Sequence, residues 1–424
     1  MELSREERRL LDGSQGPGRM RAMRYLVDIG EGLGAERMTP ITRAHCEIAE
    51  GVFAGGVAES FLNWPEEFLE EVDTFAVPTT INSHCIDIPR SDAAGFNQEA
   101  VAIVNKTQPK AMERMESRGG ISIYSCAPLG VVPSHFGEHI AITESGVSHY
   151  ANSVIGARTH HHTVGSALAA AVTGRVPLWG RHLKENRYGE VVVKFDADID
   201  RDALDYADLG ALAFWVGIKA EDKIPVWIGL NHMNYGELLY WTIAQCLMSG
   251  YDMEHAVGIT PEAPTIEAAF GPNKPSEIII LDKESLKESY AYLTTASKGE
   301  IDLVVMGCPH LSIDQVLEIA RMLEGKKIHQ SVKFVCATNV CIRAIAERMG
   351  AVEIIENAGG VVTQDACAGP CNHACLTDIT GMSTCVTNSV TAADYIPGVS
   401  GGKILAYYRN TKDCVEAAIK GRID

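Results

Sequence analysis

The chain has 424 residues, of which 46% are apolar and 22% charged, and its formal net charge is −18. At roughly 150 residues per domain, this length predicts two or three domains. The acidic balance and the scattered basic residues exclude nucleic acid as an expected ligand, because nucleic-acid binding needs a basic face. No apolar run reaches the roughly 18 residues that span a bilayer, and the N-terminus lacks the apolar core of a signal peptide. We therefore expect a cytoplasmic protein.

The N-terminal region, residues 1–195, is predicted to be an α/β region that carries substrate loops. Ser4 followed by Glu7 is the pattern of a capping box, which predicts that a helix begins here. A glycine-rich turn then leads to a second helix. Farther along, the apolar patterns predict strands at 73–82 and 120–126, an amphipathic helical stretch at 93–117, and a tightly packed helix of small residues at 163–174.

The sequence pattern predicts secondary structure less clearly in the middle region, 196–274, than in the C-terminal domain, 275–424. Near the middle, 189–200 and 223–230 resemble strands and 236–250 resembles a buried helix. In the C-terminal domain, apolar strand patterns alternate with amphipathic helical patterns, which predicts parallel sheets flanked by helices on both faces and hence an α/β fold. The strands of this domain are predicted at 276–282, 301–307, 332–338, 351–360 and 361–363.

Three cysteines lie at or near the ends of predicted strands. Cys126 ends "GISIYSC", Cys308 directly follows "IDLVVMG", and Cys367 lies in the loop after 361–363. Ligands of parallel sheets bind at the carboxyl ends of the strands. These three positions are therefore the first places in which to look for a cysteine-based site.

The stretch "QDACAGPCNHAC", residues 364–375, raises the question of what these thiols do. Disulfides are disfavoured, because the cytosol keeps thiols reduced. Structural zinc usually takes two pairs of ligands, and no second pair lies close to this stretch. An iron–sulfur cluster accepts thiolates from several loops and can leave one iron without a protein ligand. The alternative is that cysteines are small buried apolar residues, which we expect for Cys246, Cys336, Cys341 and Cys414.

Polar side chains in the loops are candidates for substrate binding and acid–base chemistry. A histidine beside a carboxylate suits proton transfer, and an arginine in a glycine-flanked loop suits carboxylate binding. The catalytic candidates are Glu138, His139, Arg158 and His310, and the substrate-binding candidates are Ser145, Asn152 and Ser153. Turn caps or structural hydrogen-bond networks are the alternatives. The histidines at 160–162 are expected to form a polar loop, since consecutive residues of regular structure cannot all face one ion.

Six segments resemble the large subunit of the aconitase X family: "DGSQGPGRMRAMRYLVDIGEGLGAERM", "FGEHIAITESGVSHYANSVIGART", "AAAVTGRVPLWGRHLKENR", "AVGITPEAP", "VVMGCPHLS" and "TNSVTAADYIPG". The resemblance covers nearly the whole chain. It implies an aconitase-like multi-domain arrangement and a hydro-lyase that uses an iron–sulfur cluster as a Lewis acid to eliminate water from a small hydroxy acid. It also implies a separate small swivel subunit carrying the catalytic serine, because no swivel domain is visible in this sequence.

The resemblance gives ligand roles to Cys126, Cys308 and Cys367, which lie in "YSCAPL", "GCPH" and "QDAC". It also implies that two loops contact the substrate, through Thr79, Thr80, Asn82, Asn388 and Ser389. The cysteine-rich sequence after Cys367 departs from the archaeal pattern. Either Cys371, Cys375 or Cys385 could therefore replace or supplement a ligand, and the cluster type stays open between [4Fe–4S] and [2Fe–2S].

The resemblance leaves two substrates open, because the family includes both cis-3-hydroxy-L-proline and mevalonate 5-phosphate dehydratases. Where archaeal relatives carry a lysine, two residues beyond Ser389, this chain has Thr391. Phosphate prefers Lys or Arg partners, so cis-3-hydroxy-L-proline is the favoured substrate and mevalonate 5-phosphate the alternative. A function of another class would be a non-catalytic iron–sulfur or zinc scaffold that senses metal or redox state. A cysteine-nucleophile enzyme using Cys308 and His310 is a third, weaker possibility.

Overall fold

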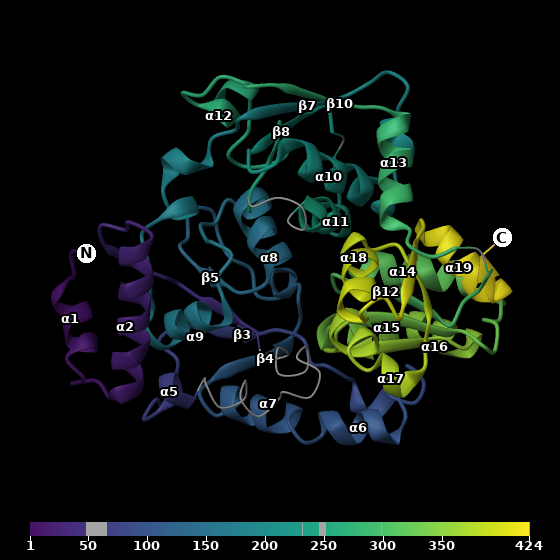
Figure 1. Cartoon of the computed structure of the whole chain (residues 1–424), viewed down its shortest axis with the longest axis horizontal. Coiled ribbons are helices and arrows are strands. Elements are labelled where there is room, and N and C mark those ends of the chain that lie inside the picture. The colour runs from purple at the N-terminus through teal and green to yellow at the C-terminus, as the bar shows by residue number, and fades with distance from the viewer. Residues whose placement is uncertain (48–65, 231, 246–251, 298, 424) are drawn as a thin grey trace.

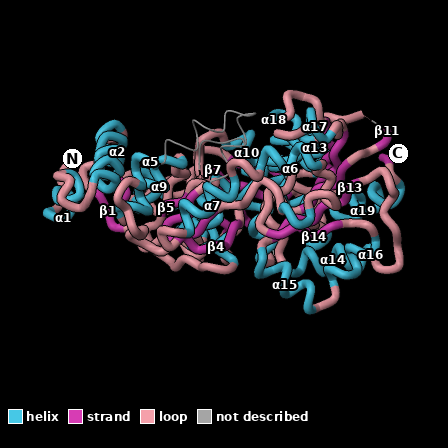
Figure 2. The backbone as a smooth tube through the Cα atoms, turned by 90° about the horizontal axis from the view of Figure 1, so that it is seen from below, coloured by secondary structure: helices cyan, strands magenta, loops and turns pink. Residues whose placement is uncertain are grey.

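The computed structural model describes residues 1–47, 66–230, 232–245, 252–297 and 299–423. These residues form three larger parallel sheets flanked by helices, which confirms the predicted α/β class. Figure 1 shows three lobes: the N-terminal lobe at the left and bottom, the middle lobe at the top, and the C-terminal lobe at the right. The two termini lie at opposite sides of the molecule in both Figure 1 and Figure 2. Within the described ranges, no helix has the length and apolar character needed to cross a membrane.

The first lobe is built on a parallel sheet with the strand order β4-β3-β2-β5. Its strands are short: β2 (Ala44–Cys46), β3 (Thr79–Ile81), β4 (Gly120–Tyr124) and β5 (Ala141–Ile142). Helix α9 (Val164–Thr173) packs against β2 and against α2 (Pro17–Gly32), and its small side chains allow this close approach. Helix α1 (Arg5–Leu11) begins at the predicted capping box, in which Ser4 and Glu7 each accept the other's backbone N–H.

Shorter elements complete this lobe. Strand β1 (Met38–Pro40) pairs antiparallel with β6 (Arg175–Pro177). The stretch predicted as one helical segment at 93–117 is two helices, because Asn97 caps the first and Pro109 stands in the first turn of the second. The remaining helices are α5 (Glu66–Leu69), α6 (Gln98–Val104), α7 (Gln108–Glu116), α8 (Ser145–Tyr150), η1 (Ile88–Arg90), η2 (Pro128–Gly130), η3 (Ala151–Ile155), η4 (Gly180–His182) and η5 (Lys184–Arg187).

The middle lobe contains a second parallel sheet, in the order β10-β7-β8-β9. Its strands are β7 (Val191–Phe195), β8 (Pro225–Ile228), β9 (His255–Ala256) and β10 (Ile278–Leu281). Its helices are η6 (Arg201–Ala203), α10 (Tyr206–Ala220), α11 (Tyr235–Gln245), α12 (Ile266–Phe270) and α13 (Lys283–Leu293). The part of the predicted helix 236–250 beyond 245 lies outside the described residues.

The pairing of β7 with β10 shifts the lobe boundaries that the sequence suggested. The predicted boundary after residue 195 leaves β7 in the N-terminal region, and the boundary before residue 275 puts β10 in the C-terminal domain. In the structure the two strands are neighbours in the middle sheet. Apolar patterns identify strands without identifying their partners, so this pairing was not predictable from the pattern alone.

The C-terminal lobe carries a five-stranded parallel sheet, in the order β14-β13-β12-β15-β16. Its strands are β12 (Leu303–Met306), β13 (Lys333–Thr338), β14 (Val361–Gln364), β15 (Thr384–Thr387) and β16 (Leu405–Tyr408), beside a small antiparallel pair of β11 (Gly299–Glu300) and β17 (Arg422–Ile423). Its helices are α14 (Ile313–Leu323), α15 (Val340–Arg348), α16 (Ala351–Ala358), η7 (Pro370–Ala374), α17 (Thr377–Thr380), α18 (Val390–Val399) and α19 (Thr411–Lys420).

The predicted strand at 351–360 is wrong, because most of this segment is helix α16. Its buried residues are Ala351, Val352, Ile355 and Ala358. This spacing repeats every three to four residues, which is the period of a helix rather than of a strand. The apolar segment that continues the sheet is β14, as the sequence predicts at 361–363.

Candidate active site

The carboxyl ends of the first and third sheets meet. The backbone N–H of His84, after β3, donates to the carbonyl of Asp365, after β14, at 2.6 Å. The N–H of Cys367 donates in turn to the carbonyl of His84 at 2.8 Å, and His84 and Ala366 form a parallel bridge. The two lobes also adjoin where α6 lies below α17 in Figure 1. Loops that follow strands of both sheets therefore lie at one junction.

This junction brings together the thiols of Cys126, Cys308 and Cys367. Cys126 lies two residues beyond β4, Cys308 two beyond β12, and Cys367 three beyond β14. All three residues are half-buried. Burial, followed by the thiols of Cys367 and Cys126, raises the pKa of Cys308 well above its ordinary value, so the three sulfurs lie close enough to interact electrostatically.

Backbone N–H groups point at two of these sulfurs. The N–H of His310 donates to Sγ of Cys126 at 3.3 Å, and the N–H of Cys371 donates to Sγ of Cys367 at 3.3 Å. Such bonds stabilise the thiolate, which is the form that binds metal. Among the residues that the structure describes, no three His, Cys, Asp or Glu side chains converge on a single ion. A cluster does not need such convergence, because its thiolates bind different irons, and three thiols from three loops fit one.

Further cysteines border the thiol site. Cys371 and Cys375 lie in and just after η7, where the thiol of Cys375 donates to a backbone carbonyl of the same turn at 3.3 Å. The thiol of Cys85 donates to the carbonyl of Cys371 at 3.1 Å. Cys385 is fully buried in β15 and belongs to the apolar core of the C-terminal lobe. Cys371 and Cys375 therefore lie near Cys367, whereas Cys385 is part of a core strand.

A pair of carboxyl groups lies at the same edge of the first sheet. The side-chain amide of Asn82 donates to the carboxylates of both Glu47 and Glu144, the second at 3.2 Å. Burial raises the pKa of Glu144 to about 7. Burial, followed by Glu144, also raises the pKa of Cys126, which places this carboxyl near the thiols. Glu47 was not among the sequence candidates, and its only signal is that it directly follows the strand "AHC".

His310 connects the loops that carry the thiols. Its Nδ1 contacts Oγ of Ser125 at 3.1 Å, and its Nε2 contacts the carbonyl of Ala366 at 2.8 Å. Because a carbonyl can only accept, the proton lies on Nε2, and Nδ1 accepts from the hydroxyl of Ser125. Burial lowers the pKa of His310 to about 4. The ring therefore orients the loops around Cys126, with both nitrogens occupied.

The loop after β15 reaches the thiols through Ser389 rather than through Asn388. The hydroxyl of Ser389 donates to the carbonyl of Cys308, and its Oγ caps α18. Asn388 is buried, and its amide is occupied at both ends: it accepts from the hydroxyl of Tyr240 at 3.1 Å and donates to Thr411 at 3.0 Å. These bonds place Asn388 in the interior of the fold.

Two further candidates lie inside strand β3. The hydroxyl of Thr79 donates to the carbonyl of Val77 at 2.9 Å, and the hydroxyl of Thr80 contacts Nδ1 of His45 at 2.9 Å. Both threonines are buried. Among the candidates of this segment, Asn82 is the one that reaches the carboxyl edge.

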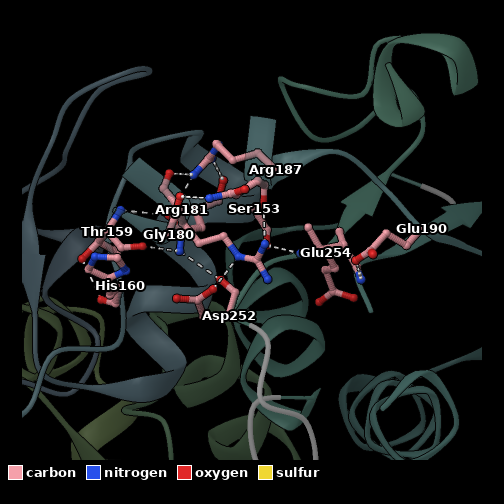
Figure 3. Close-up of polar contacts among 12 residues, drawn as sticks. Ser153, Thr159, His160, Gly180, Arg181, Arg187, Glu190, Asp252 and Glu254 are labelled. Atoms are coloured by element: carbon pink, nitrogen blue, oxygen red, sulfur yellow. Dashed lines mark hydrogen bonds and ion pairs between the residues drawn. The ribbon is translucent and has the colours of Figure 1, made fainter. Parts of the chain in front are cut away.

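Asn152 and Ser153 belong to an interior network that lies partly in view in Figure 3. The amide of Asn152 donates to the carbonyls of Thr159 and Asp252, each at 3.0 Å. Oγ of Ser153 accepts the N–H of Glu254 at 2.9 Å. Both side chains are buried, so the structure gives them partners within the protein.

Glu138, His139 and Arg158 lie at the opposite edge of the first sheet from the thiols. His139 and Arg158 form a parallel bridge just before β5, whereas Glu144 follows β5. The structure thus does not bring these three candidates together with the thiol site. Ser145 is the first residue of α8.

Comparisons with known proteins match the whole chain. Three family models match in chain order: the aconitase X first domain at 1–185, second domain at 189–291 and third domain at 301–420. The phosphomevalonate dehydratase large subunit of Methanocaldococcus jannaschii is 32% identical over all of both chains. The cis-3-hydroxy-L-proline dehydratase of Pseudomonas aeruginosa is 30% identical over 97% of this chain and 69% of that protein. The crystal structure of Thermococcus kodakaraensis aconitase X in its holo-form matches with a TM-score of 0.85 and 27% identity, over 99% of this chain and 100% of that one.

Proposed function

Because the chain belongs to the aconitase X family of dehydratases, as its large subunit, we propose that it eliminates water from a small hydroxy acid at an iron–sulfur cluster held by Cys126, Cys308 and Cys367. The observation that carries this proposal is the meeting of three thiol-bearing loops at the carboxyl ends of two parallel sheets, which is where such sheets bind ligands. Two of the sulfurs already accept backbone N–H groups.

When bound, the cluster would supply Lewis acidity toward the leaving hydroxyl group. The protein's own part is to orient the substrate and move a proton. Asn82 holds the carboxyl groups of Glu47 and Glu144 in one place, and either carboxyl can accept or donate a proton there. His310 and Ser389 fix the loops of Cys126 and Cys308 through hydrogen bonds.

A small swivel subunit is the proposed partner, and it would bring the catalytic serine. The match to Methanocaldococcus jannaschii spans the full length of a protein named as a large subunit, whereas the match to Pseudomonas aeruginosa leaves about a third of that longer protein uncovered. We expect little turnover from this chain alone and full turnover with the partner. Steady-state assays with and without the partner measure this, and full activity of the lone chain would contradict it.

For the substrate, we propose cis-3-hydroxy-L-proline, with mevalonate 5-phosphate as the alternative. Relatives with both activities are similar to this chain to the same degree. The reason for preferring the amino acid is Thr391, whose hydroxyl is buried without a partner among the described residues and offers no charge for a phosphate.

The test is dehydration of each compound by the reconstituted complex, followed by NMR. Turnover of the hydroxyproline alone supports the proposal, whereas turnover of mevalonate 5-phosphate alone reverses the assignment. The Cys308→Ala variant of the complex should lose either activity, and the Cys341→Ala variant, which changes a half-buried cysteine of α15, should retain it.

A further inference from the structure

A pocket lies at the amino ends of the strands of the first sheet, away from the thiols. Its volume is ≈ 460 Å³, which is in the range of small-molecule sites. His139, which lines it, precedes β5, whereas Glu144 at the thiol site follows β5. The polar side chains around the pocket are Arg37, Thr39, His139, Arg158, His182, Lys184 and Glu185.

Three of these side chains are cations without an acidic partner. In the described part of the chain, Arg37, Arg158 and Lys184 form no ion pair, although acidic residues outnumber basic ones by 55 to 37 overall. Glu185 is the one acid in the lining, so three positive charges less one negative charge leave a formal charge of +2. The pocket is therefore positive within an acidic protein.

Other arginines of the same region behave differently. Arg181 and Asp252 point toward each other in Figure 3. Nε of Arg181 lies 2.8 Å from Oδ1 of Asp252. Arg187 pairs with Glu262, and Arg175 pairs with Glu6 at 2.7 Å. The three cations of the pocket therefore differ from these three neighbouring arginines, whose charges are each paired with a carboxylate.

Arg158 is held in place for such a role. Its backbone N–H donates to the carbonyl of Glu138 at 2.7 Å, and its carbonyl accepts from Ile140 at 3.0 Å. Its Nη1 donates to the carbonyl of His182 at 3.1 Å, which is the one hydrogen bond that the guanidinium makes to the described residues. Most of its five N–H donors therefore remain for a ligand.

Two imidazoles form another wall of the pocket. Nδ1 of His139 lies 2.9 Å from Nδ1 of His182. One ring must donate and the other accept, so the accepting ring carries its proton on Nε2. Nε2 of His182 is buried, and the described residues offer it no hydrogen bond. Burial, followed by the charges of Arg158 and Arg187, lowers the pKa of His139, and a bound anion would oppose that effect of the arginines.

We propose that this pocket binds a small multivalent oxyanion, of the carboxylate or phosphate class, at a site distinct from the thiols. Guanidinium and ammonium groups around one concave space form charge-assisted bonds with such groups. A volume of ≈ 460 Å³ suits a small metabolite.

The test is isothermal titration calorimetry of the purified chain with inorganic phosphate in one arm and citrate in the other. At least one probe should saturate one site per chain, and the tighter probe assigns the oxyanion class. Arg158→Gln should weaken binding by about tenfold or more. Lys184→Gln should also weaken it, and because Lys184 is exposed, this variant keeps the test valid if Arg158→Gln fails to fold. The matched control is Arg321→Gln, which removes the same charge from the exposed face of α14.

Three results would overturn the proposal. The first is the absence of saturable binding of either probe to the wild-type chain. The second is a Kd that is the same for wild type, Arg158→Gln and Lys184→Gln, or that Arg321→Gln weakens equally. The third is complete loss of probe binding in the complex with the small subunit, which would mean that an acidic group of the partner fills the pocket.

Discussion

Gly307 allows a direct test of how the fold positions Cys308. It lies between β12 and Cys308 with φ of +114°, a conformation that side chains disfavour. A Cβ at this position would overlap the carbonyl oxygen of Ala337 and lie 3.0 Å from its carbonyl carbon. Because Ala337 belongs to the neighbouring strand β13 and these are backbone atoms, no rotamer change relieves the overlap. Glycine therefore lets the thiol-bearing turn lie against the sheet.

The predicted cost of Gly307→Ala has two parts. Backbone strain contributes about 1–3 kcal/mol, and the overlap contributes about 1–3 kcal/mol more, so the variant should lose about 2–6 kcal/mol of stability. Gly325→Ala is the matched control. Gly325 has φ of +70° and no atoms within 4 Å of its Cβ position, so its variant should lose only the cost of the left-handed conformation, about 1–2 kcal/mol.

Urea denaturation of both metal-free variants, followed by circular dichroism, measures the difference. The midpoint of Gly307→Ala should lie well below that of Gly325→Ala, and Gly307→Ala should also bind less iron, since its Cys308 is displaced. Equal midpoints for the two variants would refute the reasoning that close packing of this turn positions the thiol.

Two further predictions concern carboxyl groups. Glu144→Gln should lower kcat of the assembled enzyme by about 10²-fold or more, and an unchanged kcat in steady-state assays would remove Glu144 from proton transfer. Burial, followed by Asp208, raises the pKa of Asp205 to about 6, above roughly 3.9 in an unfolded chain. The folded state thus favours the protonated acid, and wild type should lose stability relative to Asp205→Asn as the pH rises from about 4 to about 6; Asn caps α10 as well as Asp does. The measurement is the urea denaturation midpoint of wild type and of Asp205→Asn across this pH range. A constant difference between the two midpoints would contradict the second prediction.

Local signals in the sequence were sufficient for individual elements. The capping box at Ser4 and Glu7 marks the start of α1, and the alternation of strands and helices gave the C-terminal sheet. These local signals do not predict which strands pair. Strands β7 and β10 are far apart in sequence, and only the folded chain shows that they are neighbours. The helix α16 was mistaken for a strand because its apolar residues are dense enough to hide their helical spacing.

In the candidate site too, local features could be predicted from the sequence, whereas spatial arrangement could not. Cys126, Cys308 and Cys367 stood out because each follows a strand, and the structure brings them to one junction. His139 and Glu144 are close in sequence, and the strand between them, β5, has only two residues. Such a short strand leaves no apolar pattern, so the sequence could not show that the two lie at opposite edges of the sheet.

The central claim, that three thiols hold an iron–sulfur cluster, is tested most directly by the iron and acid-labile sulfide content of anaerobically purified protein. Wild type and the Cys341→Ala control should contain iron and sulfide in equal amounts, and Cys126→Ala, Cys308→Ala and Cys367→Ala should each lose most of both while staying folded. Wild type with tightly bound zinc and no iron, or three variants that all retain full iron and sulfide, would contradict the account.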